Sequence, residues 1–340
     1  MVGAILPVLV TQLFAPTSFV LTYEGLDSAD SILERDAEGQ IVRINVPQQL
    51  VIMANHQIYA DWMYLWCLTY YMHAHDQVTI ILKKSLKHIP FIGWGMQFYR
   101  FIFLARSWSA DRIYLGKHLV SIAQRAQRAG QAFALLIFPE GTLVSQDTRP
   151  LSKKYADKIS IADMEHTLLP RSTGLHFILR TLGPAIPSLQ VLDVTIGYAG
   201  VPAKGYGQDH YTLRSIFFQG VPPPKIHVHL RLYPVSLIPI GNTSGKNTVG
   251  HGAEASPEEA AKFDSWLRER WIEKDRLMDG FYRDGKFSPP AGPATSVEIP
   301  VRLLNRWEAL DAYAWFAPVI AGYLLRFAGG WVMAKFASGT

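Results

Sequence analysis

The chain has 340 residues, of which 49% are hydrophobic and 18% charged, and its formal net charge is +5. This composition excludes an intrinsically disordered chain, and the charged fraction lies below the ~25% of ordinary soluble domains. The sole cysteine, Cys67, leaves no intramolecular disulfide and no cysteine-based zinc site. The sequence contains no run of five Lys or Arg residues, so it gives no support for a nucleic-acid partner. We therefore expect a globular body that lies against a membrane.

The first 23 residues are apolar, carry no charge before Glu24, and are interrupted by Pro7 and Pro16. A secretory signal would begin with a basic region, and a spanning helix would need ~20 apolar residues without two prolines. The pattern predicts a broken segment in contact with a membrane, with a transmembrane helix as the equal alternative. We assign residues 1–40 to this segment and its lead-in.

Residues 41–238 alternate between strand-like and helix-like runs, which is typical of a largely parallel sheet covered by helices. They are expected to form one α/β domain. Gly93–Gln97 belongs to a very apolar helix or hairpin. The expected strands are Leu50–Ala54, Val78–Leu82, Phe133–Phe138, Leu192–Tyr198 and Ile226–Leu232, and the expected helices are Ile58–Met72 and Ser109–Ala129.

Three segments follow this domain. Residues 239–256 are rich in Gly, Ser, Asn and Thr and predict a flexible loop. Residues 257–304 comprise a linker and an amphipathic helix over Pro257–Phe281, whose apolar residues recur at helical spacing. Residues 305–340 are expected to anchor the chain in a membrane, because Ala312–Met333 is interrupted only by Arg326 and is long enough to span.

The first chemically suggestive motif is Asn55-His56-Gln57-Ile58-Tyr59-Ala60-Asp61, which follows the first predicted strand. In a continuous helix, residues five apart lie about 140° from each other, so His56 and Asp61 would not meet. If His56 lies on the turn and Asp61 in the first helical turn, the carboxylate can reach the imidazole. Such a pair can serve as a general base and its orienting group. The alternative is an incidental His and Asp.

The second motif is Phe138-Pro139-Glu140-Gly141-Thr142, also directly after a predicted strand. Gly141 allows the backbone to approach a ligand, and Thr142 with the following amides can hold an anion. Glu140 would orient a basic residue or bind a substrate hydroxyl; an ordinary turn is the alternative reading. Because ligand sites in open α/β sheets form at the carboxyl ends of strands, the two motifs together point to one site.

With these motifs, the sequence resembles the glycerolipid, or lysophospholipid, acyltransferases. Their signature is Asn-His-x-x-x-x-Asp followed some 80 residues later by Phe-Pro-Glu-Gly-Thr, here starting at Asn55 and Phe138. The segment 101–106, Phe-Ile-Phe-Leu-Ala-Arg, looks like the family's second block. The segment 168–174, Leu-Leu-Pro-Arg-Ser-Thr-Gly, and the Trp266…Lys274-Asp275 helix look like one eukaryotic branch. That branch contains lysophosphatidic acid, lysophosphatidylinositol and lysocardiolipin acyltransferases.

The resemblance implies a membrane-attached lysophospholipid acyltransferase fold with its catalytic domain over 41–238. It implies that His56 is the general base and Asp61 its orienter, and that a lysophospholipid hydroxyl attacks acyl-CoA. Acyl-CoA is then the donor substrate, with no separate cofactor and no metal. The acceptor phosphate and glycerol would be held by Arg106, Glu140, Gly141 and Thr142. Arg171, before a helix that Ser172 and Thr173 could cap, is either a second anion site or a surface arginine that pairs locally.

Two other functions are compatible with the same motifs. A CoA-independent phospholipid transacylase would use the same His56 and Asp61, and a catalytically silent lipid-binding scaffold would need neither. The family suggests the endoplasmic reticulum membrane, with a mitochondrial membrane as the alternative.

Two smaller clusters have simple readings. Lys83, Lys84 and Lys87 lie near an apolar stretch and are either a membrane-surface anchor or a solvated face. His227 and His229 alternate along one strand face. Because the sequence offers no third ligand, we expect a solvated strand face rather than a metal site.

Overall fold

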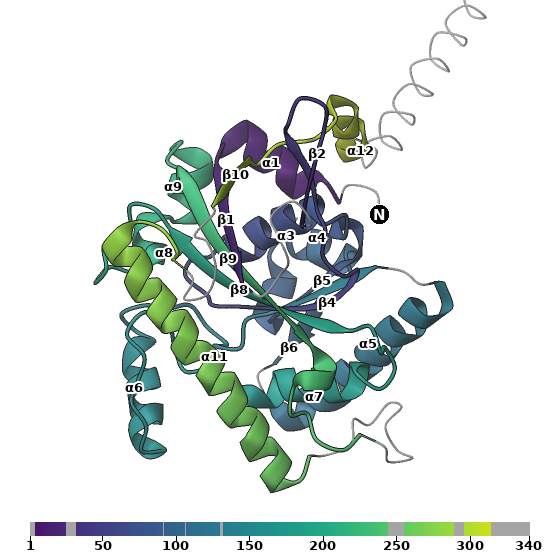
Figure 1. Cartoon of the computed structure of the whole chain (residues 1–340), viewed down its shortest axis with the longest axis vertical. Coiled ribbons are helices and arrows are strands. Elements are labelled where there is room, and N and C mark those ends of the chain that lie inside the picture. Colours follow the sequence, from purple (N-terminus) through teal and green to yellow (C-terminus); the bar gives the residue numbers. More distant parts are fainter. Residues whose placement is uncertain are drawn as a thin grey trace, which may run out of the picture.

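A computed structural model describes residues 4–24, 32–90, 92–105, 107–129, 132–243, 255–288 and 296–313. Its centre is an eight-stranded sheet in the order β10-β1-β9-β8-β4-β7-β5-β6, with β2 and β3 as a separate ribbon (Figure 1). Within the large sheet, β1–β10 and β8–β9 pair antiparallel and all other neighbours pair parallel. The expected α/β class with a mostly parallel sheet is therefore confirmed.

The strands are β1 (Ser18–Glu24), β2 (Leu33–Arg35), β3 (Ile41–Ile44), β4 (Gln49–Ala54), β5 (Val78–Lys83), β6 (Ile102–Leu104), β7 (Phe133–Ile137), β8 (Gln190–Tyr198), β9 (Lys225–Pro234) and β10 (Val297–Pro300). The α-helices are α1 (Leu6–Phe14), α3 (Asp61–Tyr71), α4 (Ile92–Phe98), α5 (Trp108–Ala129), α6 (Arg149–Lys158), α7 (Ser172–Leu182), α8 (Gly207–His210), α9 (Leu213–Phe218), α11 (Pro257–Asp284) and α12 (Ala309–Tyr313).

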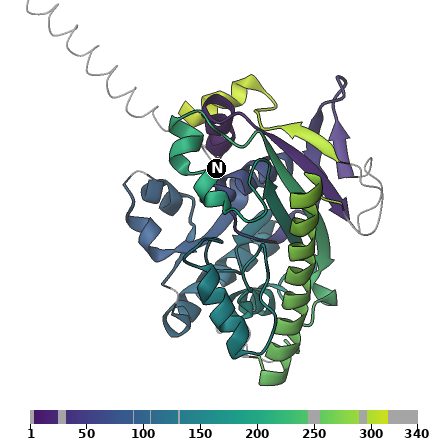
Figure 2. The same cartoon turned by 90° about the vertical axis from the view of Figure 1, so that its left-hand side faces the viewer.

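Helices cover both faces of the sheet, which explains why its central strands are buried and mostly apolar. Along β4, Leu50 and Ile52 join the core that contains α3. Val51 and Met53 point the other way, into the core built with α5, α7 and α11. The alternation follows from the two-residue period of a strand. In Figures 1 and 2, α11 runs as one long helix along the second face.

The N-terminal region differs from the broken membrane segment predicted for residues 1–23. Ser18–Glu24 forms β1, which is hydrogen-bonded between β9 and β10 in the sheet. Before it, α1 has nine residues, fewer than the ~20 that a bilayer crossing requires. The apolar character of residues 18–23 thus comes from a buried strand. Among the residues described, no helix is both long and apolar enough to cross a bilayer.

The C-terminal region returns to the sheet. A capping box of Ser256 and Glu259 starts α11, and Gly285, in the left-handed conformation at φ 70°, ends it. Then β10 pairs with β1, and the Leu303 N–H donates to Gln12 Oε1 at 2.9 Å. Residues 296–313 are thus attached to the body. Of the apolar stretch expected to form the anchor, everything beyond residue 313 lies outside the described residues.

The prediction of a solvated face for His227 and His229 is wrong. Both side chains are buried, because β9 is an interior strand and Phe281 and Phe287 pack on His227. Burial lowers the pKa of His227 to about 4 and that of His229 to about 3, so both imidazoles are neutral at pH 7. No metal-binding group of three such ligands occurs in the described part of the chain.

Candidate active site

The two motifs meet at one edge of the sheet. Strands β4 and β7 are parallel neighbours, with Met53 opposite Ile137, so the residues that follow them emerge side by side. The Phe138 ring stacks on the His56 imidazole with 4.2 Å between centroids and 20° between planes. The carboxyl ends of the strands therefore gather both motifs, as the sequence pattern indicates.

His56 and Asp61 form a hydrogen-bonded pair, with 2.8 Å between Nδ1 and Oδ2. The Asp61 side chain is fully buried, whereas 18% of the His56 side chain is exposed. With an ionised Asp61, Nδ1 carries the proton that is donated, and the Nε2 lone pair is free to accept one. Within the described residues, no partner is bonded to Nε2. The pair has the arrangement of a general base with an orienting carboxylate.

A turn brings the pair together, because α3 begins at Asp61 rather than at the predicted Ile58. The backbone N–H groups of Gln57 and Ile58 donate to Asp61 Oδ2 at 2.6 and 3.1 Å. The carboxylate therefore organises the turn before its own helix. This turn replaces the first helical turn and lets residues five apart meet.

Tyr198 is a third member of this group, and the motifs of the sequence do not point to it. Its hydroxyl donates a short hydrogen bond to Asp61 Oδ1, the oxygen that His56 does not contact. Burial, reinforced by the Asp61 charge, raises the pKa of Tyr198 well above its ordinary value, so the phenol stays a donor. Tyr198 could have been suspected from its position at the end of a predicted strand. The order of strands in the sheet was needed to show that β8 lies beside β4.

Glu140 of the second motif is buried beside the His56–Asp61 pair. Only 3% of it is exposed, and its oxygens accept N–H groups from three separate segments. These are the His56 backbone at 3.3 Å, the Leu168 backbone at 3.1 Å and the Trp271 indole at 3.3 Å. Burial raises the pKa of Glu140 to about 8, although these donors oppose the shift. Glu140 thus ties three segments of the site together, and the expected contact with the acceptor stays a prediction.

Gly141 and Arg171 lie against each other on the outer side of the same loop. Gly141 has φ +73°, a left-handed conformation that favours glycine, and a Cβ built there would lie 3.9 Å from the Arg171 side chain. The Arg171 N–H donates to the Pro139 carbonyl at 2.8 Å. Arg171 is exposed to solvent and lies against the loop that contains Gly141 and half-buried Thr142.

Two expectations about flanking residues have different outcomes. Arg171 itself is the N-cap residue of α7, and no side chain caps this helix, so the expected capping by Ser172 and Thr173 is wrong. Arg106, the expected phosphate ligand of the second block, lies outside the described residues.

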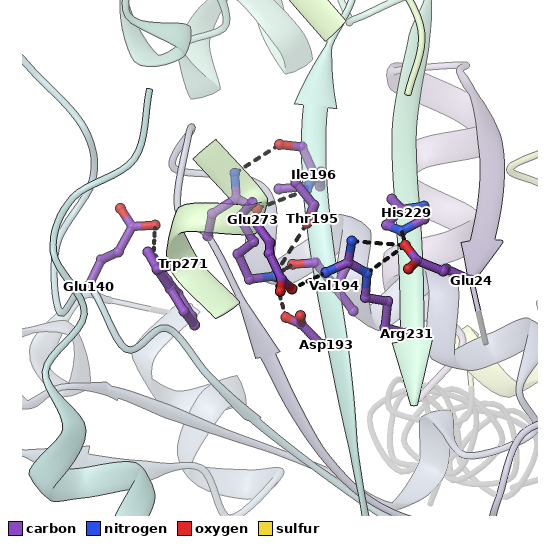
Figure 3. A network of polar contacts seen from close by, with 12 residues as sticks. Glu24, Glu140, Asp193, Val194, Thr195, Ile196, His229, Arg231, Trp271 and Glu273 are labelled. Carbon is purple, nitrogen blue, oxygen red and sulfur yellow. Dashed lines mark hydrogen bonds and ion pairs between the residues drawn. The ribbon is translucent and has the colours of Figure 1, made fainter. Parts of the chain in front are cut away.

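Helix α11 contributes buried polar groups behind the site (Figure 3). Lys274 is fully buried and forms a short ion pair with Asp193 of β8, and its Nζ also donates to the Val194 carbonyl at 2.6 Å. Burial lowers the pKa of Lys274, which the Asp193 charge opposes. Trp271, one turn earlier on α11, is the indole that donates to Glu140. The dashed lines in Figure 3 show α11 joined both to the site and to the sheet.

Known proteins similar to this chain are acyltransferases. The family model described as Acyltransferase matches residues 40–199, and that described as Acyltransferase C-terminus matches residues 251–308. An uncharacterised acyltransferase of Schizosaccharomyces pombe is 36% identical, covering 93% of this chain and 81% of the relative. The 2-acyl-1-lysophosphatidylinositol acyltransferase of Saccharomyces cerevisiae is 34% identical, covering 82% and 72% respectively. Lysocardiolipin acyltransferase 1 of Danio rerio is 33% identical, covering 72% and 56%.

Proposed function

The chain belongs to the glycerolipid acyltransferase family and is an acyltransferase, and on that premise we propose that it transfers an acyl chain from acyl-CoA to the hydroxyl of a lysophospholipid. The observation that carries this proposal is the His56–Asp61 pair at the carboxyl end of β4, with Nδ1 engaged and Nε2 available. Tyr198 and the two N–H donors hold the carboxylate in place.

In the proposed reaction, Nε2 of His56 removes the proton from the lysophospholipid hydroxyl as its oxygen attacks the thioester carbonyl. A new C–O ester bond forms, the C–S bond breaks, and the CoA thiolate leaves. The imidazolium, stabilised by Asp61, returns its proton to that thiolate, so the enzyme is restored without an acyl-enzyme intermediate. Cys67 is fully buried in α3 and takes no part.

The acceptor phosphate is proposed to bind on the loop formed by Gly141, Thr142 and Arg171. An exposed guanidinium beside a left-handed glycine offers two parallel N–H donors next to an accessible backbone, which suits a phosphate. Arg106 joins this set from its position in the second block. Relatives named for lysophosphatidylinositol and lysocardiolipin support an acceptor of the lysoglycerophospholipid class.

The proposed location is the endoplasmic reticulum membrane, with contact through the apolar helix α4. Ile92, Trp94 and Phe98 are exposed on this helix. Lys83, Lys84 and Lys87 are exposed just before it, where cations would meet anionic headgroups. Flotation with vesicles that contain phosphatidylserine tests this contact. Ile92→Glu with Trp94→Glu should reduce flotation, whereas Leu151→Glu, an exposed leucine on α6, should not.

The central experiment mixes purified protein with oleoyl-CoA and a panel of lysophospholipids, and follows free thiol with a colorimetric thiol reagent. Acceptor-dependent release of CoA with formation of diacyl product supports the proposal. Product formed from a phospholipid donor without acyl-CoA would identify a transacylase instead. Lipid binding with neither product nor thiol release would identify a silent scaffold.

A further inference from the structure

A carboxylate on α11 binds the N–H groups of the segment that leads to Arg171, while the Arg149 guanidinium binds carbonyls of the same segment. Asp275 accepts the backbone N–H groups of Glu165, His166 and Thr167 at 2.9, 2.8 and 2.9 Å. It also accepts the Thr167 hydroxyl at 3.1 Å. These three residues lie in neither a helix nor a strand. Consecutive backbone donors converging on one acceptor fix the path of a segment that has no regular hydrogen bonding of its own.

From this point the chain runs directly to the proposed phosphate loop. The next N–H, that of Leu168, donates to Glu140 at 3.1 Å, and three residues later the Arg171 N–H donates to the Pro139 carbonyl at 2.8 Å. Residues 165–171 are therefore pinned at both ends, by Asp275 at the start and by the second motif at the finish. The position of the Arg171 side chain over Gly141 depends on this path.

Helix α11 is itself fixed to the catalytic edge. One turn before Asp275, the Trp271 indole donates to the same Glu140 carboxylate that contacts the His56 backbone. Lys274, which lies between Trp271 and Asp275 along the helix, forms a buried ion pair with Asp193 on β8. Because β8 also carries Tyr198, α11 and the His56–Asp61 pair share one rigid support.

We propose that Asp275 is a positioning residue for the acceptor site: it holds residues 165–171 so that the Arg171 guanidinium stays over Gly141, where it binds the acceptor phosphate. This inference rests on the proposed function. Asp275 lies behind the loop and acts through Arg171, so its loss should weaken acceptor binding specifically. Binding of acyl-CoA and proton transfer by His56 should be nearly unaffected.

The test measures KM for lysophosphatidylinositol and for oleoyl-CoA in wild type, Asp275→Asn and Asp264→Asn. The Asp264→Asn control makes the same chemical change on the same helix, where Asp264 pairs with Arg268 one turn away. Weakening a charge-assisted hydrogen bond predicts an acceptor KM about 10-fold higher for Asp275→Asn. The KM for oleoyl-CoA should stay within about twofold, and the control should match wild type.

A double-mutant cycle separates positioning from general stability. If Asp275 acts through Arg171, adding Asp275→Asn to an Arg171→Ala background should change the acceptor KM less than about twofold. Equal effects in both backgrounds, or equal rises of both KM values, would overturn the proposal. If Asp275→Asn does not fold, Thr167→Val removes the side-chain bond to Asp275, together with a weak contact to Met164 Sδ, and keeps the Thr167 backbone bond to Asp275. It should raise the acceptor KM alone. A Thr167→Val enzyme with unchanged KM would then also contradict it.

The activity of the wild-type enzyme distinguishes failure of this proposal from failure of the proposed function. A wild type that acylates no lysophospholipid would refute the proposed function. An active wild type with an Asp275→Asn variant of equal acceptor KM would refute only the positioning role.

Discussion

Tyr198 and His56 bind opposite oxygens of one buried carboxylate. The tyrosine hydroxyl donates to Asp61 Oδ1, and Asp61 Oδ2 lies 2.8 Å from His56 Nδ1. Two backbone N–H groups complete the shell of Oδ2. The carboxylate therefore cannot rotate without breaking several hydrogen bonds, and this fixes the imidazole with Nε2 outward.

Tyr198→Phe should lower kcat about 10-fold, because it removes one charge-assisted hydrogen bond from Asp61. The KM values of both substrates should change little, since the phenol is buried away from them. Tyr64→Phe is the matched control: its hydroxyl is buried without a hydrogen-bond partner among the described residues, and its ring lies 6.2 Å from that of Tyr198. Loss of activity in Tyr64→Phe alone would reassign the role of Tyr198.

Arg171→Ala should raise the KM for lysophosphatidylinositol about 10- to 100-fold by removing a charge-assisted phosphate contact. Arg171→Lys should recover part of the affinity, because lysine keeps the charge but loses the planar fork. Arg283→Ala, an exposed arginine on the last turn of α11, should match wild type. A raised KM for acyl-CoA with an unchanged acceptor KM would assign Arg171 to the donor.

Gly141→Ala should also raise the acceptor KM, with a loss of stability of about 1–2 kcal/mol from the left-handed backbone. Gly39→Ala is the control for that cost: Gly39 has φ +78° and open space around it, but lies on the ribbon between β2 and β3. Stability measured by urea unfolding should fall in both variants. Only Gly141→Ala should raise the acceptor KM. The same acceptor KM in both variants would show that the Gly141 loop does not bind the acceptor.

The sequence pattern locates the strands that carry the site, because β4, β7 and β8 are buried on both faces and are rich in apolar residues. It also places His56 and Asp61 within reach across a turn. It misplaces β1, because a strand inside a sheet has the same apolar composition as a membrane segment. Because β1 pairs with β9, it makes β9 an interior strand. The burial of His227 and His229 on β9 could therefore not be predicted without β1.

The functions of Tyr198, Glu140 and Asp275 could not be predicted from the residues next to them in the sequence. Each depends on a partner at least 80 positions away, as in the bond of Glu140 to the His56 backbone or of Asp275 to residues 165–167. Composition and periodicity describe neighbours along the chain, whereas these contacts arise from sheet order and from the docking of α11.

The burial of His227 predicts that the free energy of unfolding depends on pH in the acidic range. Burial lowers the pKa of His227 to about 4 from an ordinary 6.5, with Lys225 adding to the shift and Glu298 opposing it. Between these values the unfolded chain binds a proton that the folded protein does not, so the free energy of unfolding falls as pH falls through this window. The slope is up to about 1.4 kcal/mol per pH unit. His227→Gln should reduce the pH slope of the urea-derived free energy of unfolding between pH 6 and 4.5, while His229, whose pKa is lowered to about 3, keeps its own contribution. An unchanged slope there would contradict this origin.

The most direct test of the catalytic assignment is the turnover of His56→Ala with oleoyl-CoA and lysophosphatidylinositol, followed by CoA release. Loss of the general base predicts a kcat about 10²–10⁴-fold below wild type, in a variant whose cooperative urea unfolding shows that it is still folded. Asp61→Asn should be nearly as damaging. A folded His56→Ala enzyme that retains turnover within about threefold of wild type would contradict the assignment of His56 as the base.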